Sequence, residues 1–352
     1  MIWDVIIAGA GPAGSVSAYI LARAGKRVLI ADRIDESRHK IGESLPAAAL
    51  RLLRSLDLVT PDRAGWHRKI TGNASCWGSD ELLLTDSIND PDGPGWRLDR
   101  HHFDRELRQS ALNAGATIYP SQILKANRSN MVWTIRTRDG QEHQACWLID
   151  ATGRQSFIAR SLGLTRERDS RLVALYALGK PSADAQTERT VVEAVQQGWW
   201  YAAILPSGTP IAGLHMRPEA AAGVERSQET WQKAWLETKH VRQLFPGMCD
   251  AQRLKPVDAS GGRLVRCAGD GWLACGDAAL AFDPLSSQGM LSALYGGVLA
   301  GRAILQELSG IPANEEYETK LTAIWQTYQG RVKSMYRQEN RWPEEQFWAN
   351  AQ

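Results

Sequence analysis

The first apolar run of the chain is short, nearly unbroken and followed directly by glycines. Residues 2–8 are apolar except for Asp4, which is the pattern of a parallel strand covered on both faces. Gly9, Gly11 and Gly14 then follow with the spacing G-x-G-x-x-G. The pattern predicts a strand that runs into a tight glycine turn.

A helix and a second strand are predicted after this turn. Residues 12–24 place small and apolar side chains on one helical face, and Gly25 is a typical helix stop. Residues 27–31 are predicted to form a second strand, which ends at Asp32. In a dinucleotide-binding unit the glycines permit the turn, the approach of a pyrophosphate and close helix packing, and the acid accepts a ribose hydroxyl. The order of these features predicts an adenine dinucleotide site and leaves open whether FAD or NAD binds there.

The middle of the chain contains alternating apolar stretches. Residues 191–194, 200–205 and 211–216 are such stretches, and Gly and Pro turns separate them. They predict antiparallel strands. We expect these strands to form a sheet over the dinucleotide site and to supply a substrate pocket.

The composition is that of a globular protein. The 352 residues are 43% hydrophobic and 23% charged, and 41 Lys plus Arg nearly balance 39 Asp plus Glu, so no nucleic acid partner is expected. The five cysteines are odd in number and lack C-x-x-C spacing, which predicts reduced thiols and no metal site. Because Asp4 and Gly9 interrupt the first apolar run, we predict no signal peptide, no membrane span and a cytoplasmic location.

A second glycine-containing motif lies in residues 271–297. Residues 272–275 are typical of a short buried strand, which runs into Gly276 and Asp277, and a helix is expected to begin near Ser287. The free N–H groups at the start of such a helix would suit the electron-rich edge of a ring.

The sequences GAGPAG at residues 9–14 and GDAALAFDPLSSQG at residues 276–289 together resemble the FAD-dependent monooxygenases of the para-hydroxybenzoate hydroxylase type. Flavin halogenases and geranylgeranyl reductases are relatives of these enzymes. The resemblance implies FAD rather than NAD, and a mixed α/β fold in which a Rossmann-type, glutathione-reductase-like FAD domain carries an antiparallel substrate sheet and C-terminal helices. It also implies that Asp277 hydrogen-bonds the ribitol chain, and that the isoalloxazine is flanked by Pro284 and the backbone of Gln288, Gly289 and Met290.

Two further stretches match the same family. Residues 95–107, GWRLDRHHFDREL, resemble the segment whose arginine lies near the cofactor, which makes Arg100 a candidate with a surface ion pair as the alternative. Residues 150–154, DATGR, resemble the turn back to the FAD domain, where Asp150 either faces the cofactor or only forms the turn. The other expected cofactor contacts are Pro12, Ala13, Arg33, Glu43, Ser44 and Gly276.

The predicted FAD domain is discontinuous. Its three pieces are residues 1–60, 95–160 and 261–305. Residues 61–94 and 161–260 are predicted to form the substrate sheet, and residues 306–352 the C-terminal helices.

Three residues are low-ranked candidates for the substrate pocket, and no catalytic residue is assigned. Strand alternation puts Trp199 and Tyr201 on one face and Trp200 on the other, and Trp200 is taken as the candidate, with burial of both faces as the alternative. His215 is a candidate acid or base, although a lone His in an apolar strand is more often a core residue. Lys69 has the spacing to a later tryptophan that halogenases show, and a surface lysine is its alternative.

The resemblance implies a monooxygenase that hydroxylates an electron-rich aromatic substrate through a flavin C4a-hydroperoxide. Because the sequence has a single dinucleotide motif, NAD(P)H would bind transiently or a partner reductase would supply the electrons. The segments GESLPA at 42–47 and GNASCWGSDE at 72–81, with the short chain, resemble compact flavoproteins associated with the maturation of tryptophylquinone-dependent oxidases. Those relatives hydroxylate a tryptophan within a partner polypeptide. We therefore expect either an aromatic small molecule or a tryptophan-containing partner protein as substrate.

Three alternatives stay open. DPLSS resembles the halogenase motif, but the halogenase segment W-x-W-x-I-P is replaced here, and GESLP is one residue short before its proline. An isoprenoid-type reductase would need a long apolar channel, which the polar residues 72–92 do not favour. A non-catalytic flavin-binding protein would hold FAD and bind its target without turnover.

Overall fold

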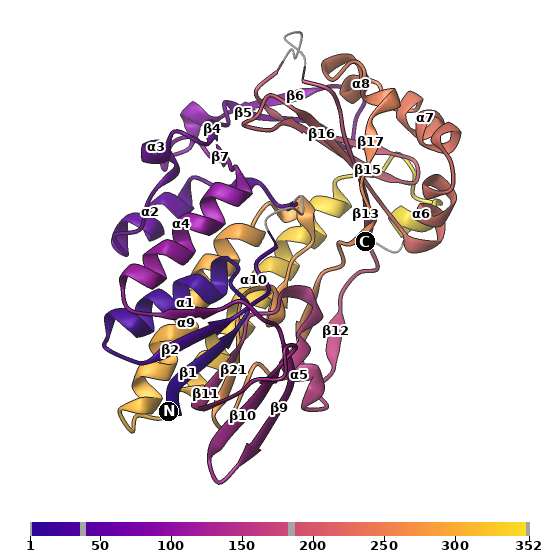
Figure 1. Ribbon diagram of the computed structural model, residues 1–352. Helices are drawn as coiled ribbons and strands as arrows, with labels where there is room; N and C mark the ends of the chain where they lie inside the picture. The colour runs from indigo at the N-terminus through magenta and orange to yellow at the C-terminus, as the bar shows by residue number, and fades with distance from the viewer. Residues whose placement is uncertain (1, 36–39, 182–186, 350–352) are drawn as a thin grey trace.

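Two large sheets form the framework of the computed structural model, which describes residues 2–35, 40–181 and 187–349 (Figure 1). The sheet that contains the N-terminal strand lies in one half of the molecule, and the sheet formed by the middle of the chain lies in the other. This mixed α/β arrangement confirms the predicted fold class.

The first sheet is built around parallel strands. Its strands are β1 Ile2–Ala8, β2 Val28–Ala31, β8 Thr117–Tyr119, β9 Ile123–Ser129, β10 Val132–Thr137, β11 Glu142–Asp150, β20 Ala268–Gly269 and β21 Trp272–Ala274. The parallel strands run in the order β21-β11-β1-β2-β8, while β20 pairs antiparallel with β21 and the β9–β10 hairpin is attached to β11. The register pairs Ala8 with Ala31 and with Asp150, and Asp150 with Ala274, so these strands end at one common edge.

Three long helices accompany this sheet (Figure 1). They are α1 Pro12–Arg23, α4 Arg100–Asn113 and α9 Gly289–Leu308. Helices α1 and α9 pack closely, since a Cβ on Gly297 would lie 2.5 Å from the Ala13 carbonyl oxygen, and the Ser17 hydroxyl lies 3.0 Å from the Gly297 carbonyl oxygen. Because α1 and α9 follow the two glycine motifs in the sequence, their contact brings the two motifs together.

The second sheet is almost entirely antiparallel. Its strands are β5 Gly72–Cys76, β6 Leu83–Asp86, β13 Val173–Leu178, β14 Thr190–Val195, β15 Gly198–Ile204, β16 Pro210–Met216, β17 Gln252–Arg253 and β18 Val257–Asp258. They follow the order β17-β13-β16-β15-β14-β5-β6, with β18 also on β13, and only the β14–β5 pair is parallel. The alternating stretches of the sequence correspond to β14, β15 and β16.

One face of the second sheet is covered by short helices. These are α6 Pro218–Glu225, α7 Gln228–Leu236 and α8 His240–Leu244. Trp200 packs among them, with ring centroids 5.0 Å from Trp231 and 5.2 Å from Trp235. Trp199 belongs to the other core cluster, on the opposite face of the strand. Both faces of β15 are therefore buried.

Smaller elements connect the two sheets. One three-stranded sheet consists of β3 Ser44–Leu45, β7 Trp96–Arg97 and β4 Arg68–Lys69. Another consists of β12 Arg166–Arg168, β19 Gly262–Leu264 and β22 Leu280–Ala281. The remaining short helices are α2 Ala48–Ser55, α3 Pro61–Ala64 and α5 Phe157–Ser161, and the 3-10 turns are Ser87–Asn89, Gly153–Gln155, Met248–Asp250, Gly276–Ala278 and Pro284–Ser286.

The C-terminal helices α10 Asn314–Arg337 and α11 Gln346–Ala349 pack against both sheets. On α10, the Tyr317 hydroxyl donates to the Ala274 carbonyl in the first sheet (2.6 Å), and Tyr336 accepts from the indole N–H of Trp199 in the second (3.1 Å). On α11, Trp348 donates to the Val195 carbonyl (3.1 Å). These helices therefore fasten the two halves of the molecule together. No helix in the described part of the chain has both the length and the apolar composition needed to cross a membrane.

Candidate active site

A cavity of about 800 Å³ lies where the two large sheets meet. Its walls come from the β1–α1 turn, the segment after β2, residues 40–44, the turn after β11, residues 282–290 and the inner face of the second sheet. Open α/β sheets bind ligands at the carboxyl ends of their strands, and pockets for small molecules and cofactors have volumes of this order. The cavity is therefore the candidate active site.

The first glycine turn has room for a ligand beside its backbone. Gly9 has φ +111° and a Cβ there would lie 2.3 Å from the Ala151 carbonyl oxygen, while a Cβ on Gly14 would lie 2.0 Å from the Gly9 carbonyl oxygen. Gly11 differs, because its φ of −75° and ψ of −177° suit any residue and no atom lies within 4 Å of its Cβ position. Folding thus requires Gly9 and Gly14, whereas Gly11 keeps open the space at the start of α1 where a pyrophosphate would bind.

Asp32 lies at the end of β2 and faces the same cavity together with Arg33. Its Oδ2 accepts the backbone N–H of Ala10 at 2.7 Å, which fixes the carboxylate beside the glycine turn. A carboxylate can accept about four hydrogen bonds, so capacity remains for a ribose hydroxyl. This geometry fits the role expected for Asp32.

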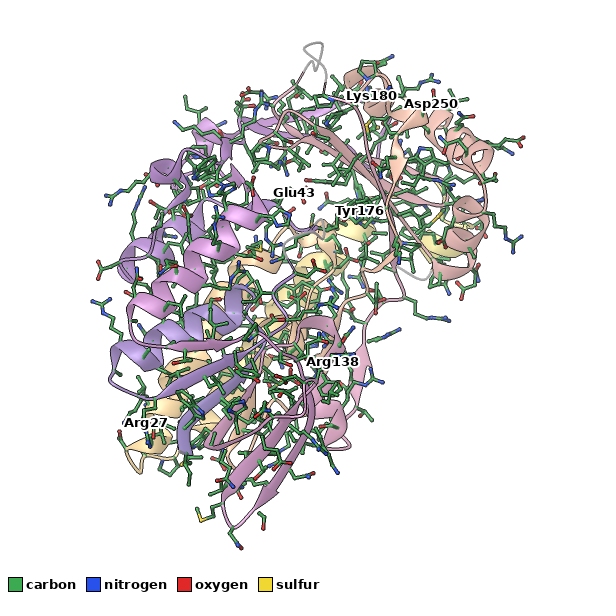
Figure 2. All side chains as sticks on the ribbon, in the orientation of Figure 1. Arg27, Glu43, Arg138, Tyr176, Lys180 and Asp250 are labelled. Carbon is green, nitrogen blue, oxygen red and sulfur yellow. The ribbon has the colours of Figure 1, made fainter. Side chains whose placement is uncertain are left out.

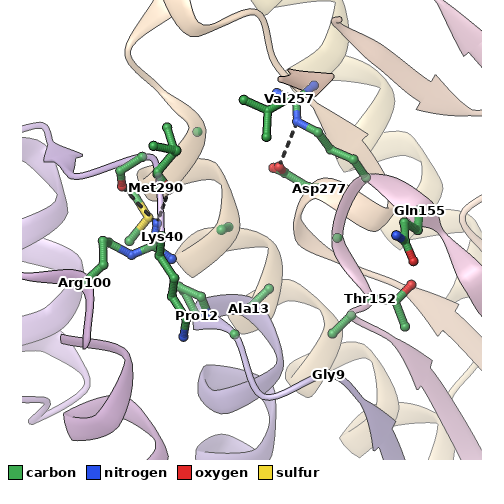
Figure 3. Close-up of a pocket in the computed structure, with 18 of the residues that line it drawn as sticks. Gly9, Pro12, Ala13, Lys40, Arg100, Thr152, Gln155, Val257, Asp277 and Met290 are labelled. Carbon is green, nitrogen blue, oxygen red and sulfur yellow. Dashed lines mark hydrogen bonds and ion pairs between the residues drawn. The ribbon is translucent and has the colours of Figure 1, made fainter. Parts of the chain in front are cut away.

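The second motif lies beside the first, and residues of both motifs border the cavity (Figure 3). A Cβ on Gly276 would lie 2.7 Å from the Cβ of Ala13, so the two turns are in direct contact. Asp277 lines the cavity, where its Oδ2 lies 3.5 Å from Nε of Arg154. Gly289 and Met290 at the start of α9 also line it, and so does Pro284 in the 3-10 turn before that helix. The donor groups, the open glycine turn and the two converging loops fit FAD.

Arg100 reaches the cavity while it also forms an ion pair. Its guanidinium donates to the carbonyl oxygens of Ile41 (2.7 Å) and Gly42 (3.0 Å) and to Asp104 (3.1 Å). Lys40 also contacts Asp104, at 2.9 Å. Burial alone would raise the pKa of Asp104, but the charges of Arg100 and Lys40 hold that pKa below its usual value. Arg100 therefore fastens residues 41–42 along the cavity wall.

Four of the expected cofactor residues are outside the cavity lining, namely Gly14, Asp150, Gly276 and Gln288. Asp150 is fully buried, where it accepts hydrogen bonds from the backbone N–H groups of Thr152 (3.0 Å) and Ala159 (2.9 Å), and burial raises its pKa. Of the two roles considered for Asp150, the structure supports the turn-forming one.

The second sheet contributes an aromatic wall to the cavity. Its members are Tyr176 on β13, Trp199 and Tyr201 on β15 and His215 on β16. The ring of His215 stacks on Trp199 with centroids 3.7 Å apart and planes 2° apart, and its Nε2 lies 3.2 Å from the Tyr176 hydroxyl. Burial lowers the pKa of His215 to about 3, so His215 is neutral near pH 7. It contributes a hydrogen-bonding ring rather than a group that titrates near neutral pH.

Two of the three pocket candidates lie away from this wall. Trp200 is on the opposite face of β15, which helices α6 to α8 cover, and its indole packs against Trp231 and Trp235 of α7. Lys69 is exposed on β4, with Nζ 5.9 Å from the ring centroid of Trp96, and it borders a separate, shallow hollow. Trp199, which was placed on the other face from Trp200, takes the position expected for Trp200.

The sequence did not single out Asp283 as a site residue, although it directly precedes Pro284 in the second motif. Asp283 lines the cavity but is only 2% exposed. Its Oδ1 accepts the N–H of Leu285 and its Oδ2 accepts the hydroxyl of Tyr336, both at 2.9 Å. Burial raises the pKa of Asp283 to about 6. A buried carboxyl group with a raised pKa in a cleft is typical of functional sites.

Replacing Asp283 by asparagine is expected to change how stability depends on pH. Because the pKa of Asp283 is about 6 in the folded chain and about 3.8 otherwise, the folded state binds more protons between those values, and stability falls as pH rises through that window. The free energy of unfolding of the wild type minus that of Asp283→Asn should fall by up to about 3 kcal/mol between about pH 4 and about pH 7. Urea unfolding of the FAD-free proteins measures this difference, and a pH-independent difference would contradict the assignment.

The described residues form neither a metal-binding cluster nor a disulfide. In the described ranges, no three His, Cys, Asp or Glu side chains are placed to hold a metal ion. The five cysteines are free thiols. Burial raises the pKa of Cys275 to about 12, so this thiol beside the second motif is protonated near pH 7.

Comparison with known proteins identifies the family. The family described as "FAD binding domain" matches residues 3–321. The protein named "Putative FAD-dependent oxidoreductase LodB" of Marinomonas mediterranea is 29% identical over 355 residues, which cover 98% of this chain and 96% of that protein.

Solved structures show the same fold. The myxobacterial chondrochloren halogenase CndH has a TM-score of 0.86 at 23% identity, covering 100% of this chain and 86% of that one. The structure of "peptidyl tryptophan dihydroxylase QhpG essential for tryptophylquinone cofactor biogenesis" has a TM-score of 0.81 at 24% identity, covering 100% and 79%. Together with the cavity, these matches establish that the chain belongs to the FAD-binding domain family and is an FAD-dependent oxidoreductase.

Proposed function

We propose that this enzyme is a monooxygenase that hydroxylates an electron-rich aromatic ring, and that the ring is a tryptophan side chain of a partner polypeptide. The observation that carries the proposal is the single cavity that joins the FAD-binding turns to the aromatic wall. Tyr176, Trp199 and His215 on that wall are each at most 5% exposed. Such a site holds an aromatic ring beside a flavin and keeps water away from the reacting atoms.

Two further observations support a polypeptide substrate. QhpG, whose fold this chain shares, is described as acting on a peptidyl tryptophan. On the terminal strand β6 and the turn after it, Leu83, Leu84 and Ile88 are 67%, 55% and 88% exposed. These three side chains are close in sequence, and exposed apolar patches are typical of surfaces that contact another protein.

The cavity gives less support to the alternatives. Within the described residues, Lys40 is the only lysine that lines the cavity, and it pairs with Asp104 beside residues 41–42. Lys69, the lysine with halogenase spacing, lies outside the cavity. The wall of Tyr, Trp and His side chains also differs from the aliphatic channel that an isoprenoid substrate requires. Hydroxylation therefore fits the described residues better than halogenation or isoprenoid reduction.

The proposed reaction converts a ring C–H bond to C–OH, with one atom of O2 in the product and the other released as water. FAD supplies the activation of O2, and its two electrons come from NAD(P)H or a partner reductase. To test this, the holoenzyme is reduced without air and mixed with isotopically heavy O2 and N-acetyltryptophanamide or a tryptophan-containing peptide. We expect heavy oxygen in the indole ring. Release of hydrogen peroxide with no labelled product would contradict the proposal, and halogenated product in the presence of bromide would favour the halogenase alternative.

A further inference from the structure

The cavity wall contains a buried carboxylate. Glu43 precedes β3 and is only 3% exposed, yet it lines the cavity. Figure 2 shows Glu43 close to Tyr176 in the middle of the molecule, where the two halves meet. The residue was expected to contact the cofactor, and its partners come from both sides of the cavity, since Gly42 and Arg97 lie in segments predicted for the FAD domain and Tyr201 lies on the second sheet.

The partners of Glu43 leave part of its carboxylate available. Oε1 accepts the hydroxyl of Tyr201, and Oε2 accepts the backbone N–H of Gly42 at 3.0 Å. Nη1 of Arg97 is 3.8 Å from Oε1, which is too long for a hydrogen bond. Since a carboxylate can accept about four hydrogen bonds, these partners do not saturate Glu43.

Arg97 is directed mainly to neutral oxygen atoms. Its Nη1 lies 2.5 Å from the hydroxyl oxygens of Ser44 and Tyr201, and its Nη2 lies 2.8 Å from the hydroxyl of Thr190. A structural pair of Arg and Glu would normally form two parallel hydrogen bonds. Here Arg97 and Glu43 form an ion pair at 3.8 Å without a direct hydrogen bond, and Tyr201 bridges them by accepting from Arg97 and donating to Glu43.

Glu43 is close enough to the aromatic wall for its charge to affect the pKa of Tyr176. Burial raises the pKa of the Tyr176 hydroxyl, and the nearby charge of Glu43 raises it further. Asp283 adds to this effect, and Arg154 opposes it. Tyr176 stands on β13 in the second sheet, so Glu43 and the aromatic wall share one compartment.

We propose that Glu43 is the catalytic base of the reaction and accepts the heteroatom proton of the substrate, which for tryptophan is the indole N–H. This inference rests on the proposed hydroxylation. As the new C–O bond forms, the N–H bond breaks, its electron pair moves into the ring, and the proton passes to Glu43. The ring carbon then releases its own hydrogen as a proton to water, and Glu43 returns the first proton to nitrogen. The net reaction is the one stated above, with Glu43 unchanged.

The test compares N-acetyltryptophanamide with its 1-methyl derivative, which has no N–H. Wild-type holoenzyme should oxygenate the N–H probe faster by about a hundredfold or more, because positioned acid–base groups contribute roughly 10²- to 10⁴-fold. In Glu43→Gln the rate with the N–H probe should fall by about a hundredfold or more, while the rate with the methylated probe should change less than about threefold. Because the substitution slows only the probe that carries the N–H group, the lost rate is assigned to the contact between Glu43 and that group.

Two further variants separate the chemistry from folding. Tyr201→Phe keeps Glu43 and Arg97, so it should retain the preference for the N–H probe. Glu106→Gln, on α4 and outside the cavity lining, is the matched control and should behave as wild type. Flavin absorbance and unfolding curves show whether each variant holds FAD and folds. If Glu43→Gln does not fold, equal wild-type rates with the two probes would still overturn the role of Glu43.

The possible failures are distinguishable. If wild-type enzyme oxygenates neither probe nor a tryptophan-containing peptide, the proposed hydroxylation fails and this inference with it. If wild type oxygenates both probes at equal rates, the role of Glu43 alone is overturned. The same follows if Glu43→Gln slows both probes by one factor, because Glu43 would then be structural.

Discussion

Replacing Gly11 with alanine is expected to leave the FAD-free protein at least as stable as wild type and to weaken FAD binding by about a hundredfold or more. The backbone of Gly11 is in the β region, and no protein atom lies within 4 Å of its Cβ position. A Gly→Ala change at a compatible site stabilises a protein by about 0.4–1 kcal/mol. The added methyl group, however, would hold a pyrophosphate away from the N–H groups at the start of α1, and each hydrogen bond to a charged group is worth about 1.5–3 kcal/mol.

Gly14→Ala is the matched control for this experiment. A Cβ at Gly14 would lie 2.0 Å from the Gly9 carbonyl oxygen, so this variant should lose stability with or without FAD. Thermal unfolding of the FAD-free proteins and fluorescence titration with FAD measure the two effects separately. If Gly11→Ala binds FAD as wild type does, the space beside Gly11 does not serve the cofactor.

The substitutions Trp199→Ala and Trp200→Ala are expected to cost similar stability but to differ in function. Both indoles are at most 1% exposed, and truncating a buried Trp costs about 3–5 kcal/mol. Trp199 lines the cavity and stacks on His215, whereas Trp200 packs against Trp231 and Trp235 behind the sheet. Trp199→Ala should therefore also abolish binding of an aromatic probe, and Trp200→Ala should leave that binding within about threefold of wild type.

Urea unfolding measures the stability of each tryptophan variant, and the change in flavin absorbance on adding N-acetyltryptophanamide measures probe binding. Probe binding is compared in the absence of urea, at a temperature where both variants retain FAD. Equal loss of probe binding in both variants would show that the aromatic wall does not contact the substrate. Loss in Trp200→Ala alone would place the substrate on the other face of the sheet.

Much of the cofactor side could be predicted because its signals are local in the sequence. The run 2–8, the glycine spacing and the following helix lie next to one another, and the structure has β1 at Ile2–Ala8 and α1 at Pro12–Arg23. The second motif carried the same kind of signal, and Pro284, Gly289 and Met290 all line the cavity. Short-range geometry fixes these elements, so pattern and spacing are sufficient to find them.

The substrate side could be predicted less well, because it depends on contacts between distant segments. Alternation placed Trp199 and Trp200 on opposite faces correctly, but only the packing of α6 to α8 decides which face meets the cavity. Glu43, Arg97 and Tyr201 come from three elements far apart in the sequence, and no spacing rule connects them. For Asp150 the sequence left open a cofactor contact or a turn, and only its burial and its hydrogen bond to Thr152 in the structure favour the turn.

We expect two loops that are remote in the sequence to hold one FAD molecule. A crystal structure of the protein grown with FAD would show where the cofactor binds. We expect density for the pyrophosphate against residues 9–14 and for the isoalloxazine against residues 284–290, with the aromatic wall of the second sheet facing the ring. FAD bound at another place, or a cavity filled only by solvent at saturating FAD, would contradict this expectation.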